Sequence, residues 1–267
     1  MKIEEFDNRL RELLNNETSR CEEKLRESVL YAVFSGGKRV RPSLSFLTAE
    51  FCDITDDEVF ELAAAIELLH SYSLVHDDLP CMDNDDFRRG NPTVHKKFGE
   101  AVAVLTGDAL LNLTYEVLFN KCIKMPDCLN SALVIARAGG VDGIIGGQIS
   151  EFVNGEFDTS LILQIEKKKT SSLIEAAILS VALLSHDNQK ISALSEYARN
   201  LGLSFQICDD LLDKDKNEKV SLVTSLGESE ARSLLSKLTE KAINAIKAFE
   251  NSDKLIEICT KLAQRTN

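Results

Sequence analysis

Apolar residues recur at the three- and four-residue spacing of amphipathic helices along nearly the whole chain. The first stripe consists of Phe6, Leu10, Leu13 and Leu14, and the next of Leu25, Val29, Ala32 and Val33. Further stripes cover 62–73, 94–120, 129–153, 160–185, 190–213 and 228–265. The segments between them are polar or contain glycine, such as Gly36-Gly37 and Gly90-Asn91-Pro92. The pattern predicts an all-α bundle of about ten helices.

Composition supports this fold class. The chain has only 4 Pro and 13 Gly, fewer than the usual ~5% and ~7%. A β-sandwich or an α/β fold of this length would need more turn residues than that. No linker interrupts the helical pattern, so we expect residues 1–267 to form a single domain.

Charge and cysteine usage restrict the partners and the compartment. The formal net charge of −12 argues against nucleic acid or an anionic membrane as the main partner. The 7 cysteines form no C-x-x-C pair, as expected for free thiols in a reducing compartment. The N-terminus is charged and amphipathic, unlike a signal peptide. The longest mostly apolar stretch, Ile174–Leu184, is too short to span a bilayer, so we expect a cytoplasmic protein without a membrane span.

Two groups of aspartates follow apolar helical stripes, one within 70–93 and one within 205–213. In the second group, FQICDDLLD, Asp209 and Asp213 are four residues apart and therefore project from the same face of a helix. Gln206 lies three residues before Asp209 and shares that face. The spacing predicts a polar cluster directed to one side of an otherwise apolar helix.

The first group, HSYSLVHDDLPCMDNDDFRRGNPT, carries Asp77 and Asp83 six residues apart, which would not align on a straight helix. Pro80 lies between them and should distort the helix, so we expect Asp83 to swing back towards Asp77. Carboxylates on one face repel each other unless cations neutralise them. Mg²⁺ prefers a few carboxylates together with water and substrate phosphates. Two facing clusters therefore predict a diphosphate held through several Mg²⁺ ions, and favour this over a solvated acidic surface.

An anionic substrate also needs cationic donors. The string Gly36-Gly37-Lys38-Arg39-Val40-Arg41-Pro42 places three cations beside two glycines. Glycine lets the backbone approach a phosphate closely, while arginine offers a planar fork and lysine a point charge. On its own such a string is also typical of a basic surface turn, so its meaning depends on the aspartates elsewhere in the chain.

Together these residues resemble the trans-isoprenyl diphosphate synthase family. The matching segments occur in the family's order and are GGKRVRP, the 70–93 run, GGQ at 146–148, KTSSLI at 169–174 and FQICDDLLD. The D-D-x-x-x-x-D spacing, with Pro80 inside it, is similar to that of bacterial farnesyl diphosphate synthases. The resemblance implies an isoprenoid synthase-like bundle of helices around a central cavity.

The resemblance also implies roles for individual residues. The diphosphate of isopentenyl diphosphate would be held by Gly37, Lys38, Arg41, His70 and Arg89. The allylic diphosphate would be held by Arg88, Lys169, Thr170, Gln206 and Lys219. The metal ligands would be Asp77, Asp78, Asp83, Asp209 and Asp213, with Asp78 and Asp213 acting through water or neighbouring side chains. The catalytic set would be Asp77, Asp83, Arg88, Lys169 and Asp209.

The implied reaction joins isopentenyl diphosphate head to tail to an allylic diphosphate. The allylic C–O bond breaks, the double bond of isopentenyl diphosphate attacks the resulting cation, and a proton is lost. The implied cofactor is a group of about three Mg²⁺ ions per site, for which Mn²⁺ can substitute. These ions and the cationic side chains stabilise charge on the leaving pyrophosphate, so no protein nucleophile is required.

Product length is expected to depend on the residues before Asp77. Tyr72 and Ser73 precede it by five and four positions, which places them roughly 6–8 Å below the metal site along a helix. In the family an aromatic residue at this place accompanies a C15 product, and a smaller one a C20 product. Tyr72 therefore favours farnesyl diphosphate, with a C20 or longer product as the alternative.

The sequence departs from the family after its second aspartate motif. Only 214–218 separate Asp213 from Lys219, so the expected loop is short, and Lys214 or Lys216 could take the place of Lys219. Two other functions remain open: a terpene cyclase, against which GGKRVRP argues, and a non-catalytic partner subunit, which would be expected to have lost one aspartate motif. The family also implies a homodimer, although the sequence does not identify the interface.

Overall fold

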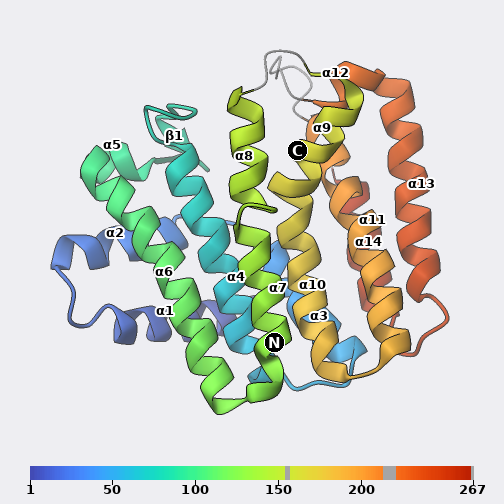
Figure 1. Ribbon diagram of the computed structural model, residues 1–267, viewed down its shortest axis with the longest axis horizontal. Coiled ribbons are helices and arrows are strands. Elements are labelled where there is room, and N and C mark those ends of the chain that lie inside the picture. The colour runs from blue at the N-terminus through green and yellow to red at the C-terminus, as the bar shows by residue number, and fades with distance from the viewer. Residues whose placement is uncertain (154–156, 213–220, 266–267) are drawn as a thin grey trace. The chain divides into compact units, whose positions relative to one another are not determined.

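The computed structural model describes residues 1–153, 157–212 and 221–265. Helices make up most of the described chain and group into two compact units (Figure 1). One unit comprises Met1–Phe46 and Asp56–Pro126, and the other comprises Leu47–Thr55 and Asp127–Asn267. The predicted all-α class is therefore confirmed.

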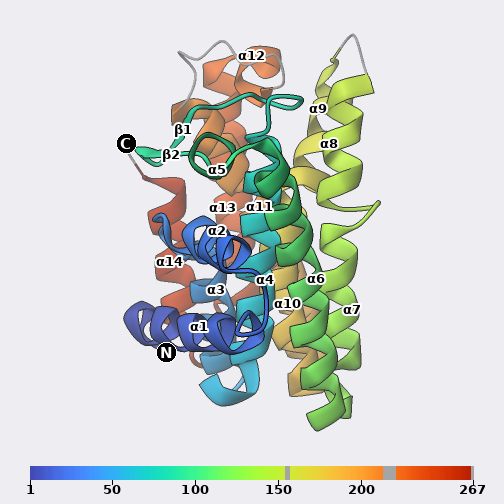
Figure 2. The same cartoon turned by 90° about the vertical axis from the view of Figure 1, so that its left-hand side faces the viewer.

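The first unit is built around α4, whose side chains are buried on nearly every side. Its helices are α1 (Ile3–Glu17), α2 (Glu23–Phe34), the beginning of α3 (Val40–Phe51), α4 (Asp56–Asp77), α5 (Val94–Phe98) and α6 (Glu100–Lys124). Two short antiparallel strands follow α4, namely β1 (Phe87–Arg88) and β2 (Asn91–Pro92). Helices α4 and α6 lie side by side in both views (Figures 1 and 2). The aspartates at the end of α4 are therefore carried by a helix that is packed in the core of this unit.

The second unit is centred on the long helix α11, against which α10 and α13 pack. Its α-helices are α7 (Leu129–Gly139), α8 (Ile144–Val153), α9 (Thr159–Glu166), α10 (Ser172–Ala182), α11 (Asn188–Leu212), α12 (Leu222–Leu226), α13 (Glu228–Ile246) and α14 (Asp253–Ala263). Short 3₁₀ segments occupy Pro126–Cys128 and Leu183–Ser185, and a π-helical segment occupies Lys167–Ser171. Apolar side chains of α9, α11 and α13, such as Ile165, Ile207 and Leu235, form a common core.

Glycines interrupt several of the predicted stripes. Gly36 and Gly37 follow α2 with φ values of 107° and 138°, which only glycine adopts readily, so that stripe ends where the sequence predicted. Gly99, with φ 93°, separates α5 from α6 within the single stripe expected at 94–120. A turn at 140–143 likewise divides the stripe expected at 129–153 into α7 and α8. The helices are thus shorter and more numerous than the periodicity alone indicated.

Two segments, Glu100–Lys124 and Pro126–Val153, have the length and composition of a membrane-spanning helix. Both are longer than Ile174–Leu184, so the expectation that Ile174–Leu184 is the longest mostly apolar stretch is wrong. In each segment 44% of the apolar window is buried within the protein, and core helices of soluble proteins meet the same criterion. Length and composition therefore do not by themselves mark these helices as membrane spans.

Candidate functional site

The first aspartate group lies where α4 ends. The helix stops at Asp77 instead of kinking, because Pro80 has no N–H and restricts the residue before it. The chain then turns back, and the backbone N–H of Asp83 donates to the carbonyl oxygen of Asp77 at 2.9 Å. Asn84, with φ 57°, completes the turn. The backbone thus brings Asp83 next to Asp77, as the proline predicted.

Asp78 has a different environment from Asp77. Its side chain is only 5% exposed and accepts from Nε and Nη2 of Arg88 at 2.7 and 2.6 Å. Burial raises the pKa of Asp78, and the ion pair with Arg88 opposes that shift. The carboxylate of Asp78, a predicted metal ligand, is therefore already paired with Arg88. This geometry suits a residue that orients Arg88 better than one that contacts a metal ion directly.

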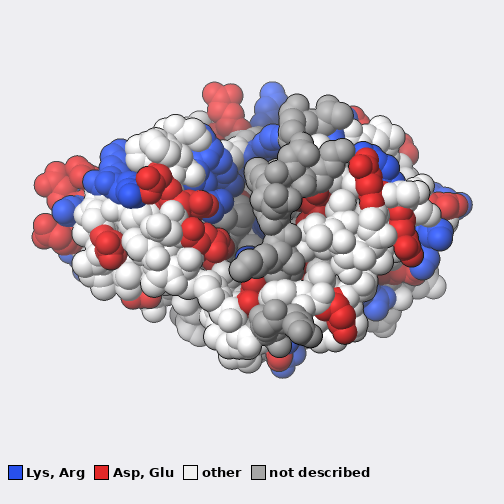
Figure 3. Space-filling model, turned by 90° about the horizontal axis from the view of Figure 1, so that it is seen from above, with Lys and Arg blue, Asp and Glu red and all other residues white. Residues whose placement is uncertain are grey.

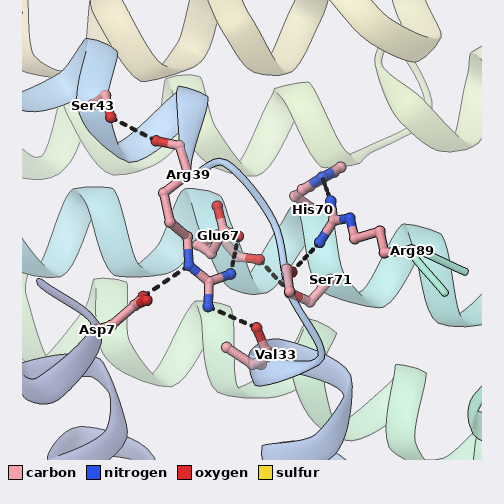
Figure 4. Close-up of polar contacts among 9 residues, drawn as sticks. Asp7, Val33, Arg39, Ser43, Glu67, His70, Ser71 and Arg89 are labelled. Atoms are coloured by element: carbon pink, nitrogen blue, oxygen red, sulfur yellow. Dashed lines mark hydrogen bonds and ion pairs between the residues drawn. The ribbon is translucent and has the colours of Figure 1, made fainter. Parts of the chain in front are cut away.

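Arg89 and His70 point toward each other in the basic cluster, as Figure 4 shows. The guanidinium of Arg89 donates to the carbonyl oxygen of Gly36, and its Nη2 lies 3.4 Å from Nε2 of His70. A Cβ atom on Gly37 would lie 2.6 Å from Nη1 of Arg89, so only glycine leaves room for the arginine here. Three residues expected at one diphosphate, Gly37, His70 and Arg89, are thus brought together.

The charge state of His70 follows from this cluster. Burial lowers the pKa of His70 well below its ordinary value of 6.5, and the guanidinium groups of Arg41 and Arg89 lower it further. The imidazole is therefore neutral at pH 7, and its Nε2 is placed to accept from Arg89. Lys38 is exposed and Arg41 half-buried in the same part of the chain. A neutral histidine leaves the cationic character of the cluster to the arginines and lysine.

Arg39, the third cation of the glycine-rich string, is directed away from this cluster. Its Nε lies 2.8 Å from the carboxylate of Asp7, and its Nη1 lies 2.5 Å from that of Glu67 (Figure 4). Its Nη2 donates to the carbonyl oxygen of Val33 at 2.8 Å. Because the side chains of Arg39 and Glu67 are 3% and 4% exposed, this ion pair belongs to the core. The string therefore leaves at most two cations, not three, for an external anion.

In the second unit, the GGQ and KTS segments pack directly on each other. A Cβ atom on Gly147 of α8 would lie 2.7 Å from the backbone nitrogen of Lys169. Lys169 belongs to the π-helical segment, a local widening that is frequent at functional sites. Its Nζ pairs with Glu151 at 2.8 Å, and Thr170 Oγ1 lies 3.5 Å from the carboxylate of Glu166. The two predicted allylic-site residues, Lys169 and Thr170, thus share one irregular turn.

Gln148 was not among the predicted site residues. Its side chain is buried, and neither its Oε1 nor its Nε2 has a hydrogen-bond partner among the described residues. Leaving a buried amide unpaired costs about 1–3 kcal/mol. Such an amide next to the π-helical segment is well suited to bind a polar ligand. In the sequence, the only indication of this residue is that it is the glutamine of the GGQ segment.

The second aspartate group also divides into two environments. Asp210 is buried and accepts from the backbone N–H of Leu222 at 2.7 Å and from Oγ of Ser221 at 3.2 Å. Gln206 donates to the same carboxylate at 2.8 Å, so this predicted allylic-site residue is engaged with Asp210. Asp209 is half-exposed and is paired with Arg265, which sequence reasoning did not single out.

The remaining predictions concern two places. Tyr72 and Ser73 are buried in α4, and the Tyr72 ring meets that of His76 edge-on with centroids 5.9 Å apart. Burial raises the pKa of the Tyr72 hydroxyl. The other predicted residues, Asp213, Lys214, Lys216 and Lys219, lie outside the described part of the chain.

Each of the two compact units carries predicted aspartate ligands whose oxygens suit a hard cation. Among the described residues no three His, Cys, Asp or Glu side chains converge on one point. Asp77, Asp83 and Asp209 offer only carboxylate oxygens, which are the ligands of Mg²⁺ when water and substrate phosphates complete its coordination. Although the net charge is −12, Lys and Arg side chains lie among Asp and Glu side chains on the face in Figure 3.

Comparisons with known proteins agree with these features. The polyprenyl synthetase family model matches residues 22–262. A farnesyl diphosphate synthase from Micrococcus luteus is 33% identical over 98% of this chain and 96% of its own. A chloroplastic geranylgeranyl pyrophosphate synthase from Catharanthus roseus is 36% identical over 91% of this chain and 74% of its own. The crystal structure of an FPP/GFPP synthase from Zymomonas mobilis is 35% identical, covers 97% of this chain and 98% of that chain, and superimposes with a TM-score of 0.87.

Proposed function

Because the chain belongs to the polyprenyl synthetase family and is a prenyltransferase, we propose that it makes farnesyl diphosphate. One isopentenyl diphosphate joins dimethylallyl diphosphate, a second joins the resulting geranyl diphosphate, and each condensation releases pyrophosphate. The observation that carries the proposal is the cluster in which Arg89 crosses Gly37 and meets a neutral His70. It is an anion site within the same compact unit as the Asp77–Asp83 turn. A diphosphate with its counter-ions fits that combination of charges.

Each diphosphate is assigned its own set of donors. Isopentenyl diphosphate is held by Gly37, Lys38, Arg41, His70 and Arg89. The allylic diphosphate is held by Arg88, Lys169 and Thr170, with Gln206 and Lys219 as further candidates. Asp77, Asp83 and Asp209 hold Mg²⁺, which supplies charge neutralisation for the departing pyrophosphate. The surroundings of the described residues among them support the assignment, Lys219 lies outside the described part of the chain, and all of these roles are part of the proposal.

The chain's own contribution is binding, orientation and charge. Arg88 is oriented by the buried Asp78, so its guanidinium is held ready for a phosphate oxygen without reorganisation. Lys169 must exchange its partner Glu151 for the substrate, which a half-exposed lysine does at little cost. Apolar walls such as Tyr72 exclude water from the allylic cation. No nucleophilic side chain is required, because the attacking electrons come from the double bond of isopentenyl diphosphate.

A C20 product is the second candidate, since a geranylgeranyl pyrophosphate synthase is among the relatives. The buried ring of Tyr72 is the feature that favours C15. An aromatic side chain at this depth fills space that a longer isoprenoid tail would require. A terpene cyclase is disfavoured because it does not require the Gly37–Arg89 cluster. A non-catalytic partner subunit is disfavoured because both aspartate groups are present in the sequence.

The proposal is tested by incubating the purified protein with dimethylallyl diphosphate, labelled isopentenyl diphosphate and Mg²⁺. We expect a C15 product that disappears with EDTA. The Tyr72→Ala variant should shift the main product to C20 or longer, because the wall below the site is removed, whereas Ser71→Ala, at another buried position of α4, should still make C15. Absence of any product would reject the reaction, and a C20 product from the unmodified protein would reject only the assigned length.

We also propose that the protein is a homodimer that buries the exposed apolar side chains of α7, α8 and the turn between them. These side chains are between 44% and 77% exposed and comprise Leu129, Leu133, Val141, Ile145, Ile149, Phe152 and Val153. Contiguous apolar surface of this kind marks protein interfaces. Its four-residue spacing along α8 forms a ridge that a second copy can match. Light scattering should give twice the mass of one chain, and Ile145→Glu with Ile149→Glu should give a monomer; a monomeric unmodified protein would refute the proposal.

A further inference from the structure

His76 of α4 is seated on a glycine of the neighbouring helix α6. A Cβ atom on Gly107 would lie 2.7 Å from Cε1 of His76 and closer still to its Nε2 and Cδ2. The imidazole therefore fills the space in which any larger residue at 107 would place its side chain. Because α4 and α6 lie side by side in both views, this contact is a fixed point between the two helices (Figures 1 and 2).

The ring also makes directional contacts on the same helix. Its Nε2 lies 3.1 Å from the carbonyl oxygen of Val104, which assigns the proton to Nε2, since a carbonyl can only accept. The same nitrogen lies 3.9 Å from the carboxylate of Asp108. The imidazole is thus held by shape over Gly107 and by hydrogen bonding one turn away.

Two functional features of α4 adjoin this ring. Asp77 is the next residue and the last of the helix. Tyr72 lies one turn earlier, and its ring meets the imidazole at 87°, with centroids 5.9 Å apart. A displacement of His76 would therefore reach both the end of α4 and the aromatic wall expected to limit product length. The sequence motifs alone did not single out His76.

We propose that His76 is a positioning residue whose ring, seated on Gly107, holds the last turn of α4 against α6 and so fixes Asp77 and the ring of Tyr72. The inference rests on the proposed function for the roles of Asp77 and Tyr72, but the contact between His76 and Gly107 is independent of it. Loss of the ring frees the end of α4 to move, and a side chain on Gly107 pushes the ring away.

The contact is tested by an exchange of sizes. In the middle of a helix, alanine is intrinsically more favourable than glycine, so Gly107→Ala alone should raise the melting temperature if nothing opposes it. We expect the reverse in the unmodified protein, because the new methyl group collides with His76. In the His76→Ala background, Gly107→Ala should raise the melting temperature instead. The same sign in both backgrounds would overturn the proposed contact.

The positioning role is tested by metal binding and product length. Binding of Mn²⁺ in the presence of inorganic pyrophosphate, followed by electron paramagnetic resonance, should weaken about tenfold in His76→Ala, as is typical when a supporting residue behind a metal ligand is lost. His76→Gln should bind almost normally, because its Nε2 can still donate to Val104. The Ala variant should also release some product longer than that of the unmodified protein.

Leu110→Ala serves as the matched control, because it removes a fully buried side chain from α6, one turn beyond Gly107. If His76→Ala behaves like Leu110→Ala in Mn²⁺ affinity and product length, with only a lower melting temperature, the positioning role is refuted and the contact is structural. An unmodified protein that neither binds Mn²⁺ nor forms product would instead reject the proposed function, while the melting temperatures would still decide the contact.

Discussion

Replacing Arg39 by alanine is expected to destabilise the protein by about 3–5 kcal/mol, the usual effect of leaving one partner of a buried ion pair uncompensated. The carboxylate of Glu67 is 4% exposed and would lose the guanidinium that lies 2.5 Å from it. The carbonyl oxygen of Val33 and the carboxylate of Asp7 would lose their donor as well. Urea unfolding measured by circular dichroism gives this difference directly.

Lys38→Ala is the control for this prediction. Lys38 is the preceding residue and is exposed, so its removal should change the free energy of unfolding by less than about 0.5 kcal/mol. Replacing both charges, with Arg39→Met and Glu67→Leu together, should recover most of the lost stability, because an apolar pair of similar size needs no compensation. An Arg39→Ala variant as stable as Lys38→Ala would contradict the assignment of Arg39 to the core.

The glycine-rich string shows where sequence reasoning stops. Its residue types predict cations beside a flexible backbone. Nothing in the string itself indicates that Arg39, unlike Lys38 and Arg41, points into the core. The direction of Arg39 is set by Asp7 on α1 and Glu67 on α4, which are distant in sequence. Only the packing of those helices distinguishes a substrate-binding cation from a structural one.

The fold itself was largely predictable, because helical periodicity is a local property of the chain. The predicted stripe running towards Asp77 corresponds to α4, and the stripe at 190–213 corresponds to α11. The breaks were less visible. Gly99 ends α5 inside an apolar stripe, and the π-helical turn at Lys167–Ser171 has no periodicity of its own. Its geometry depends on the close approach of Gly147, which is a tertiary contact.

Each aspartate pair presented the same difficulty. Asp209 and Asp210 point about 100° apart on α11, and Asp78 follows the last residue of α4, so the two members of each pair can face different surroundings. The sequence pattern identifies both aspartate pairs, but it does not indicate which aspartate of each pair is buried and which is more exposed. The structure places Asp78 on Arg88 and Asp210 on Ser221 and Leu222, whereas Asp209 is the more exposed member of its pair.

That division leads to the largest expected effect on activity. Asp209→Asn is expected to lower kcat by about 10²-fold or more. In the proposed mechanism Asp209 holds Mg²⁺, and an amide binds Mg²⁺ far less well than a carboxylate and leaves the departing pyrophosphate less neutralised. Its ion pair with Arg265 is half-exposed on the Asp209 side, so the melting temperature should change little. Steady-state kinetics and a thermal melt on the same preparation separate the two effects.

Asp210→Asn is the neighbouring variant with the opposite profile. Its carboxylate accepts the backbone N–H of Leu222 at 2.7 Å, and an amide nitrogen turned towards that group leaves it unpaired. We expect the free energy of unfolding to fall by about 1–3 kcal/mol. The loss of activity for each folded molecule should be smaller than in Asp209→Asn. Should Asp209→Asn keep its kcat while Asp210→Asn loses it at unchanged stability, the two roles would have to be exchanged. The inference that the buried aspartate is structural and the more exposed one binds the metal would then be wrong.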